Sequence, residues 1–243
     1  MTWTTRPRFE FGDLAAVRHG AGPPVLLLHG VGLRAEAWGA QLDGLSPRFS
    51  IVAPDMPGHG NSVFKGNLPL LRDYTDRVAA AMDGPMHVAG HSMGAMIALD
   101  LACRYPTLVR SVAALNAIYR RAPQARDAVR ARATALPADQ LSDPTPTLHR
   151  WFTDLNNAAA RACHDWLTTV SPAGYKSAYT VFAAEDGPSD SCLRDLTCRA
   201  VFMTGAEELN STPEMSERMA KLTPDGQCAL IAGAAHMLSL IHI

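Results

Sequence analysis

The chain has no excess of either charge and no long apolar run. Its 243 residues include 22 Lys and Arg against 23 Asp and Glu, so the formal net charge is −1 at pH 7. A nearly neutral chain gives no electrostatic reason to bind nucleic acid or an anionic membrane. No segment reaches the ~18 apolar residues that a membrane span needs. The first residues also lack the apolar core of a signal peptide. We therefore predict neither nucleic acid nor membrane as a partner.

Cysteine is scarce, and its five copies are scattered along the chain. No C-x-x-C pair occurs, and the histidines and carboxylates lack metal-ligand spacing, so we predict no metal site and no cofactor. Reduced thiols in a cytoplasmic protein are the expected state of the cysteines. They are Cys103, Cys163, Cys192, Cys198 and Cys228.

Apolar residues, by contrast, make up 47% of the chain, which excludes disorder and suits one large α/β domain with a sizeable core. Short apolar runs alternate with helical patterns such as Ala35–Leu45 and Leu70–Met82. This alternation predicts right-handed crossovers and a mostly parallel central sheet flanked by helices. One or two short strands with a turn near Gly12 are expected over Arg8–His19. The predicted buried strands are Val25–Leu28, Ser50–Ala53, Met86–Ala89, Ser111–Leu115, Val201–Thr204 and Cys228–Ile231.

The pattern changes between about residues 119 and 195. Ala and Arg dominate Ala122–Ala135, loops rich in Pro and Asp follow, and two helical patterns cover Thr147–Val170 and Ala173–Ala184. We predict a core of residues 1–118 and 199–243 with a helical cap, residues 119–198, inserted into it. Aromatic residues of the cap are candidates for a substrate pocket, although aromatics also commonly hold helices together. The substrate-binding candidates are Trp151, Phe152 and Tyr179.

The pentapeptide Gly90–Gly94 reads G-x-S-x-G. The apolar run Met86–Ala89 precedes it and Ala95–Leu99 reads as the start of a helix, so the motif has the strand–turn–helix context of a nucleophile elbow. Glycines on either side let strand and helix approach closely around a strained serine. We predict Ser92 as a nucleophile at the carboxyl edge of the sheet.

A serine hydroxyl needs a base within hydrogen-bond reach, and the base needs an orienting acid. With this elbow both partners follow the serine in the order acid, then histidine. Two of the downstream histidines fall in the predicted cap, and His242 lies at the chain terminus. His236 follows the last strand on a loop of small residues, and we predict it as the base. Either Glu207 or Glu208, after the preceding strand, can supply the acid. The downstream histidines are His149, His164, His236 and His242.

The oxyanion of a serine hydrolase needs two backbone N–H donors. We predict that Met93, directly after the serine, and Val31, in the loop after the first buried strand, provide them. His29 is expected to brace that loop, and Asp55 and His59 are expected to stabilise the glycine-rich turn at residues 55–62. His91 is expected to pack or hydrogen-bond locally.

Together these segments resemble the α/β-hydrolase superfamily in order and spacing, over nearly the whole chain. The resemblance implies a serine hydrolase with an α/β-hydrolase fold. It favours Glu208 over Glu207, because the family's acid usually stands three residues after the glycine, although there as Asp. Residues 171–175, after Trp151 and Phe152, resemble the cap of 3-oxoadipate enol-lactonase-type hydrolases and related esterases. The segments that carry the main resemblance are residues 29–32, 55–62, 90–94 and 205–208.

The family's chain normally continues past the catalytic histidine into a long final helix. Here it stops seven residues after His236, with Met237–Ile243. A truncated or frame-shifted reading frame is the expectation that follows. Without that helix, apolar sheet surface is expected to be exposed and His236 poorly anchored.

The sequence therefore predicts a hydrolase that cleaves a small carboxylic ester or lactone through Ser92, His236 and Glu208. A serine at the elbow, in place of aspartate, argues against dehalogenases and epoxide hydrolases. Three alternatives stay open: a carbon–carbon bond hydrolase, a cofactor-free perhydrolase, and a non-catalytic ligand-binding member of the same fold. The acyl group, the leaving group and the oligomeric state are not specified by the sequence.

Overall fold

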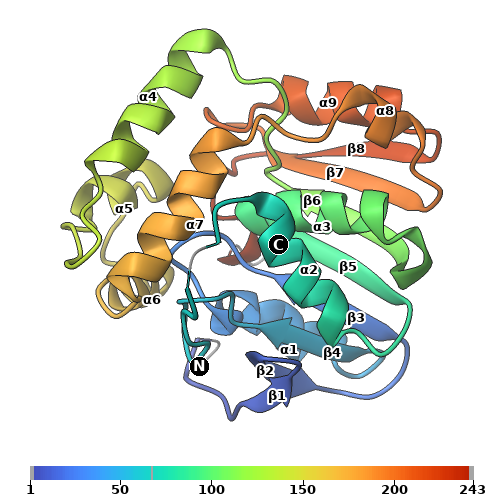
Figure 1. Ribbon diagram of the computed structural model, residues 1–243, viewed down its shortest axis with the longest axis horizontal. Helices are drawn as coiled ribbons and strands as arrows, with labels where there is room; N and C mark the ends of the chain where they lie inside the picture. Colours follow the sequence, from blue (N-terminus) through green and yellow to red (C-terminus); the bar gives the residue numbers. More distant parts are fainter. Residues whose placement is uncertain (1–2, 67, 241–243) are drawn as a thin grey trace.

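The computed structural model describes residues 3–66 and 68–240, and these residues form one eight-stranded sheet (Figure 1). The strand order is β1-β2-β4-β3-β5-β6-β7-β8. β1 and β2 are antiparallel to their neighbours, and the pairings from β4 to β8 are parallel. The strands are β1 (Phe9–Phe11), β2 (Leu14–His19), β3 (Pro24–Leu28), β4 (Ser50–Pro54), β5 (Met86–His91), β6 (Val109–Leu115), β7 (Arg199–Gly205) and β8 (Gly226–Ile231). The predicted mostly parallel sheet is confirmed.

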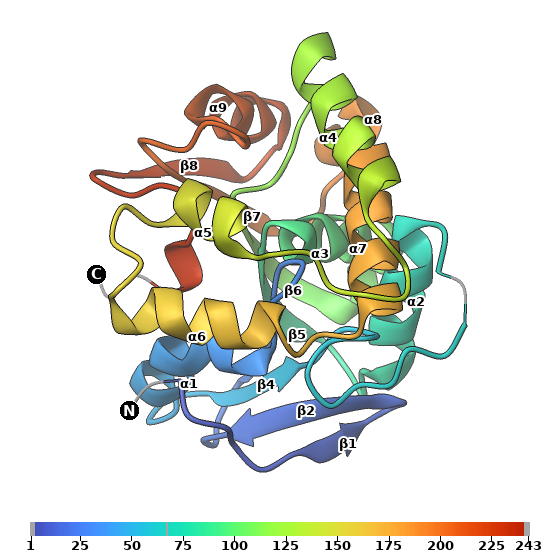
Figure 2. The same cartoon turned by 90° about the vertical axis from the view of Figure 1, so that its left-hand side faces the viewer.

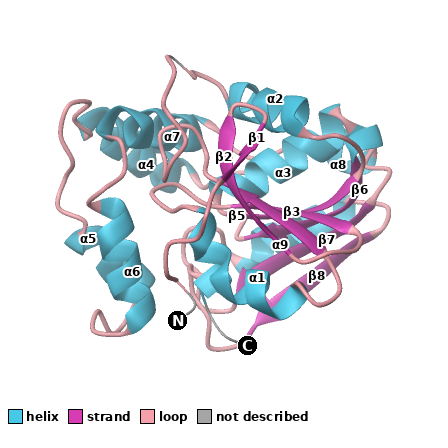
Figure 3. Ribbon diagram, turned by 90° about the horizontal axis from the view of Figure 1, so that it is seen from below, coloured by secondary structure: helices cyan, strands magenta, loops and turns pink. Residues whose placement is uncertain are grey.

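Helices cover both faces of the sheet (Figure 3). Successive side chains of a strand point to opposite faces, so the apolar strands give both faces side chains that helices bury. Leu26 and Leu28 of β3 enter the core on the side of α2, α3 and α9, whereas Val25 and Leu27 pack on the side of α1. A short 3-10 helix, η1, makes the first turn of the predicted 35–45 helix. The helices of this layer are η1 (Ala35–Trp38), α1 (Gly39–Leu45), α2 (Leu71–Ala81), α3 (Met93–Arg104), η2 (Pro106–Leu108) and α9 (Pro213–Leu222).

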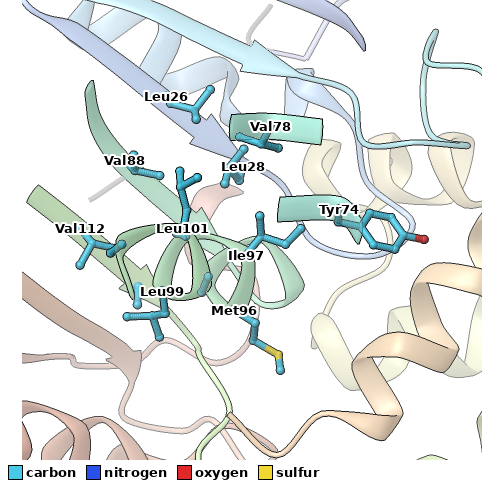
Figure 4. Packing of buried hydrophobic residues seen from close by; sticks show 14 of the residues in the cluster. Leu26, Leu28, Tyr74, Val78, Val88, Met96, Ile97, Leu99, Leu101 and Val112 are labelled. Atoms are coloured by element: carbon cyan, nitrogen blue, oxygen red, sulfur yellow. The ribbon is translucent and has the colours of Figure 1, made fainter. Parts of the chain in front are cut away.

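The central helix α3 is the most buried of the described α-helices, with nine of its twelve residues buried. Its side chains fill the space between the sheet and α2, where Ile97 and Leu101 lie among Leu28, Val78 and Val88 (Figure 4). A helix that is apolar around most of its circumference must be enclosed on several sides. The start of α3, where the G-x-S-x-G motif lies, is thereby fixed against the sheet.

Between β6 and β7 the described chain forms helices and no strand. The first four of these helices lie to one side of the sheet, whereas the fifth packs beside α9 (Figures 1 and 2). The 147–170 pattern, expected as one helix, is two. Asp154 accepts a hydrogen bond from the backbone of Asn156, and Asn157 caps the new helix through Ala160 N, so local side-chain bonds replace helical ones. The five helices are α4 (Pro123–Ala135), α5 (Thr145–Trp151), α6 (Ala158–Leu167), α7 (Pro172–Ala184) and α8 (Asp190–Arg194).

The two ends of this inserted segment are joined to each other at a neck, which we define as residues 118–121 and 182–187. Arg120 N and Arg121 N donate to the backbone oxygen and the carboxylate of Asp186. The buried guanidinium of Arg121 donates to the backbone oxygens of Phe182 and Glu185. The cap boundaries at 119 and 198 remain a proposal, but the neck lies close to them.

The expected reduced state of the thiols is wrong for two of the five cysteines. Cys103, near the end of α3, forms a disulfide with Cys192 of α8. The two are 89 residues apart, so no short spacing motif announces the pair. Packing of α8 beside α9 brings Cys192 onto the end of α3. Cys163, Cys198 and Cys228 are free.

Two glycines test how tightly α3 is held. A Cβ on Gly94 would lie 2.1 Å from the Leu28 oxygen, whereas a Cβ on Gly44 in α1 would meet nothing within 4 Å. We expect Gly94→Ala to destabilise the protein by about 3 kcal/mol, because backbone cannot yield as a side chain can. Gly44→Ala should stabilise it by about 0.5–1 kcal/mol through helix propensity. Urea unfolding measures both. Equal effects would contradict the close packing of α3 on β3.

Candidate active site

Ser92 stands at the turn between β5 and α3 with φ +56° and ψ −118°. A non-glycine residue adopts such a backbone only where its surroundings impose it. Here a Cβ on Gly90 would lie 2.0 Å from the Gly94 oxygen, so strand and helix meet with no side chain between them. Ser92 N also donates to Leu115 O at 2.8 Å. The local geometry is that of a nucleophile elbow.

His236 and Glu208 come together from the loops after β8 and β7. The His236 Nδ1 to Glu208 Oε2 distance is 3.2 Å. The other carboxylate oxygen, Oε1, accepts hydrogen bonds from Asn210 N at 2.8 Å and Ser211 N at 3.1 Å. Glu207 is exposed, and its backbone N–H donates to Ala234 O. Of the two glutamates that the sequence left as competitors, Glu208 is therefore the one that contacts the imidazole.

The carboxyl of Glu208 is buried yet stays ionised. Burial alone would raise its pKa, but the hydrogen bonds from His236, Ser211 and Asn210 and the charge of the imidazole lower that pKa to about 2. A carboxylate that accepts several N–H groups is stabilised in its charged form. An ionised acceptor at Nδ1 directs that proton of His236 toward Glu208 and leaves Nε2 as the free nitrogen.

The loop that carries His236 is fixed by its own backbone. The His236 carbonyl oxygen accepts hydrogen bonds from Asn116 Nδ2 and His91 Nε2, both at 2.6 Å. The next residues pack inward, and Leu238–Leu240 forms a buried 3-10 turn, η3. The expectation that His236 is poorly anchored is wrong, because contacts within residues 91–240 hold it. Leu230 of β8 is 47% exposed. His242 lies outside the described residues.

A cavity of about 590 Å³ opens in front of these groups. Ser92, His236 and Glu208 all line it, as does Val31. Among the hydrogen bonds of the described residues, none joins Ser92 Oγ to the His236 imidazole. The two side chains therefore line the same cavity without a direct hydrogen bond. Catalytic hydrogen bonds are often long before a substrate binds, and this arrangement is compatible with proton transfer.

The two N–H groups predicted for an oxyanion lie beside Ser92. Met93 begins α3, where the first N–H groups of a helix have no intrahelical acceptor. Val31 lies in the turn after β3, and no acceptor within the described part of the chain takes its backbone N–H. Both donors are therefore free for a ligand atom, and the helix dipole of α3 adds positive potential there.

His29, His59 and Asp55 make hydrogen bonds that hold neighbouring loops together. His29 Nε2 accepts from Met56 N, and His59 Nε2 accepts from Gly32 N, so the two rings tie neighbouring loops together. Asp55 accepts hydrogen bonds from Ala35 N at 2.8 Å, Asn61 N at 2.9 Å and the Arg8 guanidinium at 2.9 Å. None of these three residues lines the cavity.

The candidates from the cap separate into two groups. Trp151 and Tyr179 line the cavity, and the Trp151 ring stacks on His236 with centroids 5.9 Å apart and an interplanar angle of 19°. Phe152 does not line the cavity. It packs instead in the apolar cluster of α5, α6 and η3, beside Trp166. For an aromatic residue at the end of a helix, the sequence does not indicate whether the ring lines the cavity or packs in the apolar cluster.

Three residues around the site were missed by the sequence reasoning. Arg132 of α4 and Arg150 of α5 both line the wall of the cavity, and both donate to Thr147 Oγ1, at 2.6 and 3.1 Å. Asn116 does not line the cavity, but its side chain links the loop after β6 to His236. Arg132 stands in an Arg-rich stretch, and the polar face of a surface helix gives the same pattern.

Neither a membrane helix nor a metal cluster is found within the described residues. No helix there has the length and hydropathy to cross a bilayer. No group of three or more His, Cys, Asp and Glu side chains there is arranged to hold a metal ion.

The fold and the site correspond to a known family. A model of the alpha/beta hydrolase family matches residues 25–242. The chain belongs to this family. It is 37% identical to an (E)-2-((N-methylformamido)methylene)succinate hydrolase of Acinetobacter baylyi, over 91% of this chain and 86% of that protein. The resemblance noted in the sequence is confirmed, and a hydrolase of small molecules is the activity that the family supports.

Among solved structures, two alpha/beta hydrolases share the fold at low identity. A thermophilic esterase from Thermogutta terrifontis, with malate bound, has a TM-score of 0.83 at 22% identity and covers 97% of this chain and 93% of its own. The enol-lactonase from Burkholderia xenovorans has a TM-score of 0.81 at 21% identity, over 95% and 93% of the chains. At these identities the likeness shows the fold alone.

The buried histidines make stability depend on pH. Desolvation lowers the pKa of His29 to about 4 and those of His59 and His91 to about 3. Unfolded histidine titrates near 6.5, so between that pH and about 4 the unfolded chain binds more protons. Stability should therefore fall on acidification, with each histidine contributing a loss of about 1–2 kcal/mol at pH 5. Guanidinium unfolding at pH 7.5, 6 and 5 measures this.

The carboxylates titrate in a separate window. Burial would raise the pKa of Glu36, but its hydrogen bonds to Arg8 and Arg6 lower it to about 2, as similar bonds do for Glu208. Their stabilisation is complete above the unfolded pKa and is lost as pH falls from about 4.5 toward 2. An unfolding free energy that stays constant from pH 7.5 to 5 would contradict the neutral, buried state of the three histidines.

Proposed function

We propose that the protein is a serine hydrolase that cleaves a small carboxylic ester or lactone through an acyl-enzyme. The observation that carries the proposal is the convergence of Ser92, His236 and Glu208 on one cavity from three separate loops. Membership of the alpha/beta hydrolase family supports the hydrolase class. A cytoplasmic location is a prediction that accompanies this proposal.

In the proposed mechanism, His236 Nε2 takes the proton of Ser92 as Oγ attacks the substrate carbonyl carbon. The carbonyl oxygen becomes an oxyanion held by the N–H groups of Val31 and Met93, a contribution of about 3 kcal/mol per donor. His236 then returns the proton to the leaving oxygen as the carbon–oxygen bond breaks. Water, activated by the same imidazole, hydrolyses the acyl-enzyme and restores Ser92.

A second candidate reaction is amide hydrolysis by the same groups. The relative of Acinetobacter baylyi, 37% identical over most of both chains, is named for a formamide carried on a methylenesuccinate. With such a substrate, Ser92 would attack the amide carbonyl and His236 would protonate a leaving nitrogen. The two candidates differ in the leaving atom, and a panel of esters, lactones and enamides distinguishes them.

The two neighbouring glutamates give a matched test of the triad. Glu208→Gln removes the anion beside His236 Nδ1, and we expect kcat to fall by about 10³-fold or more. Glu207→Gln should leave kcat within about threefold, because that side chain is exposed and does not contact the imidazole. Steady-state hydrolysis of p-nitrophenyl acetate measures both, with circular dichroism to verify folding. Equal losses in the two variants would reject Glu208 as the acid.

Covalent labelling tests the nucleophile independently of substrate. A fluorophosphonate probe should modify the wild-type protein at Ser92, and Ser92→Ala should abolish the adduct together with hydrolysis of p-nitrophenyl acetate. Mass spectrometry of the labelled peptide locates the site. A folded wild-type protein without an adduct would instead favour the non-catalytic ligand-binding alternative.

Trp151 is a positioning residue in this proposal. Its indole lies against the imidazole of His236, where it restrains the ring and stabilises the imidazolium formed during attack. We expect Trp151→Leu to lower kcat by about 3–30-fold while Trp151→Phe retains most of it. If Leu and Phe lower kcat alike, or if only KM changes, the stacked ring does not act through His236.

A further inference from the structure

Two guanidinium groups converge on one hydroxyl in the wall of the cavity. Arg132 comes from α4 and Arg150 from α5, and both donate to Thr147 Oγ1. Thr147 is only 5% exposed. The Tyr175 hydroxyl, also in the cavity wall, is a further partner of Thr147 and Arg132. The cavity wall therefore presents guanidinium donors from two arginines to the same space.

The charges of these two arginines are not balanced by carboxylates in the part of the chain that the structure describes. Some other arginines of the inserted segment are paired: Arg120 and Arg194 contact Asp190, and Arg126 contacts Asp186. Arg132 instead lies over the ring of Tyr179, 5.2 Å from its centroid. Two cations held near each other repel, and an anion between them would relieve that repulsion.

Negative groups of the cavity lie on a different element. Glu207 and Glu208 belong to the loop after β7, and Glu208 is engaged by His236. The cations lie on α4 and α5 within the inserted segment, whereas the two glutamates lie outside it, after β7. An anionic ligand in the cavity is repelled by Glu207 and attracted by the arginine wall. Its orientation relative to Ser92 is then set by charge.

We propose that Arg132, Arg150 and Thr147 form a carboxylate-binding subsite that selects substrates with an ionised carboxylate remote from the scissile carbonyl. Guanidinium groups bind the two oxygens of a carboxylate in a planar fork, and Thr147 holds the two arginines together by accepting from both. The subsite rests on the proposed function, because it places the carbonyl at Ser92 while the carboxylate lies at the arginines. The substrate class is thus an acyl compound that carries a free acid.

A matched pair of esters tests this selection. Mono-p-nitrophenyl adipate carries a free carboxylate, and methyl p-nitrophenyl adipate is the same ester with that carboxylate capped. In the Arg132→Gln/Arg150→Gln variant, kcat/KM for the acid should fall about 30-fold or more, chiefly through KM. The value for the methyl ester should stay within about threefold. Arg132→Lys, which retains the charge, should recover part of the loss.

Arg130 provides the control, because it is an exposed arginine of α4 that does not line the cavity. Arg130→Gln should leave both esters unaffected. Equal losses for the two esters in the double variant would show a structural role, and no loss for the acid would show that the arginines do not bind it. Either result overturns the subsite.

Ligand binding separates failure of the subsite from failure of the proposed hydrolysis. If wild type cleaves neither ester, the proposed function fails, and calorimetry with succinate still tests the arginines. Succinate should bind wild type and Arg130→Gln, and its affinity should fall about tenfold or more in the double variant. Equal succinate affinity in all three proteins overturns the subsite. Tighter binding of inorganic phosphate than of succinate would overturn the assignment to carboxylate.

Discussion

The left-handed backbone at Ser92 is the constraint on which the site depends. It exists because Gly90 and Gly94 let β5 and α3 meet backbone to backbone, and because α3 is enclosed by apolar side chains along most of its length. The free energy of core burial therefore maintains a local conformation that an isolated peptide would not adopt. The position of Ser92 in the cavity lining and the N–H of Met93 at the start of α3 are both consequences of that turn.

His236 is fixed by backbone contacts as well as by its own ring. The His236 carbonyl receives hydrogen bonds from His91, at the end of β5, and from Asn116, directly after β6. His91 precedes Ser92 directly, so one hydrogen bond ties the serine turn to the histidine loop. Trp151 then covers the imidazole from the side of the inserted helices. The ring is held between sheet and insertion before any substrate arrives.

The sequence predicted the sheet and the members of the site that follow strands. Buried parallel strands are continuous apolar runs, and side chains directly after them collect at one edge, so Ser92 and His236 could be placed by order. Order left Glu207 and Glu208 as alternatives, and only the family resemblance favoured Glu208. The arginines of α4 and α5 could not, because their direction depends on how the inserted helices pack. The Cys103–Cys192 disulfide was missed for the same reason, since it depends on the docking of α8. Phe152 and Trp151 are adjacent in sequence, and only the helix orientation separates them.

The neck gives the inserted segment a particular relation to the sheet. Because residues 118–121 lie hydrogen-bonded against residues 182–187, the chain leaves and re-enters the core at nearly the same place. For the core on either side of the neck, the roughly sixty residues between its two halves are equivalent to one tight turn. A change in the length of the helices beyond the neck would therefore leave the spacing of Ser92, Glu208 and His236 unaltered. One part of the polypeptide shapes the wall of the cavity, and another part carries the three side chains at its base.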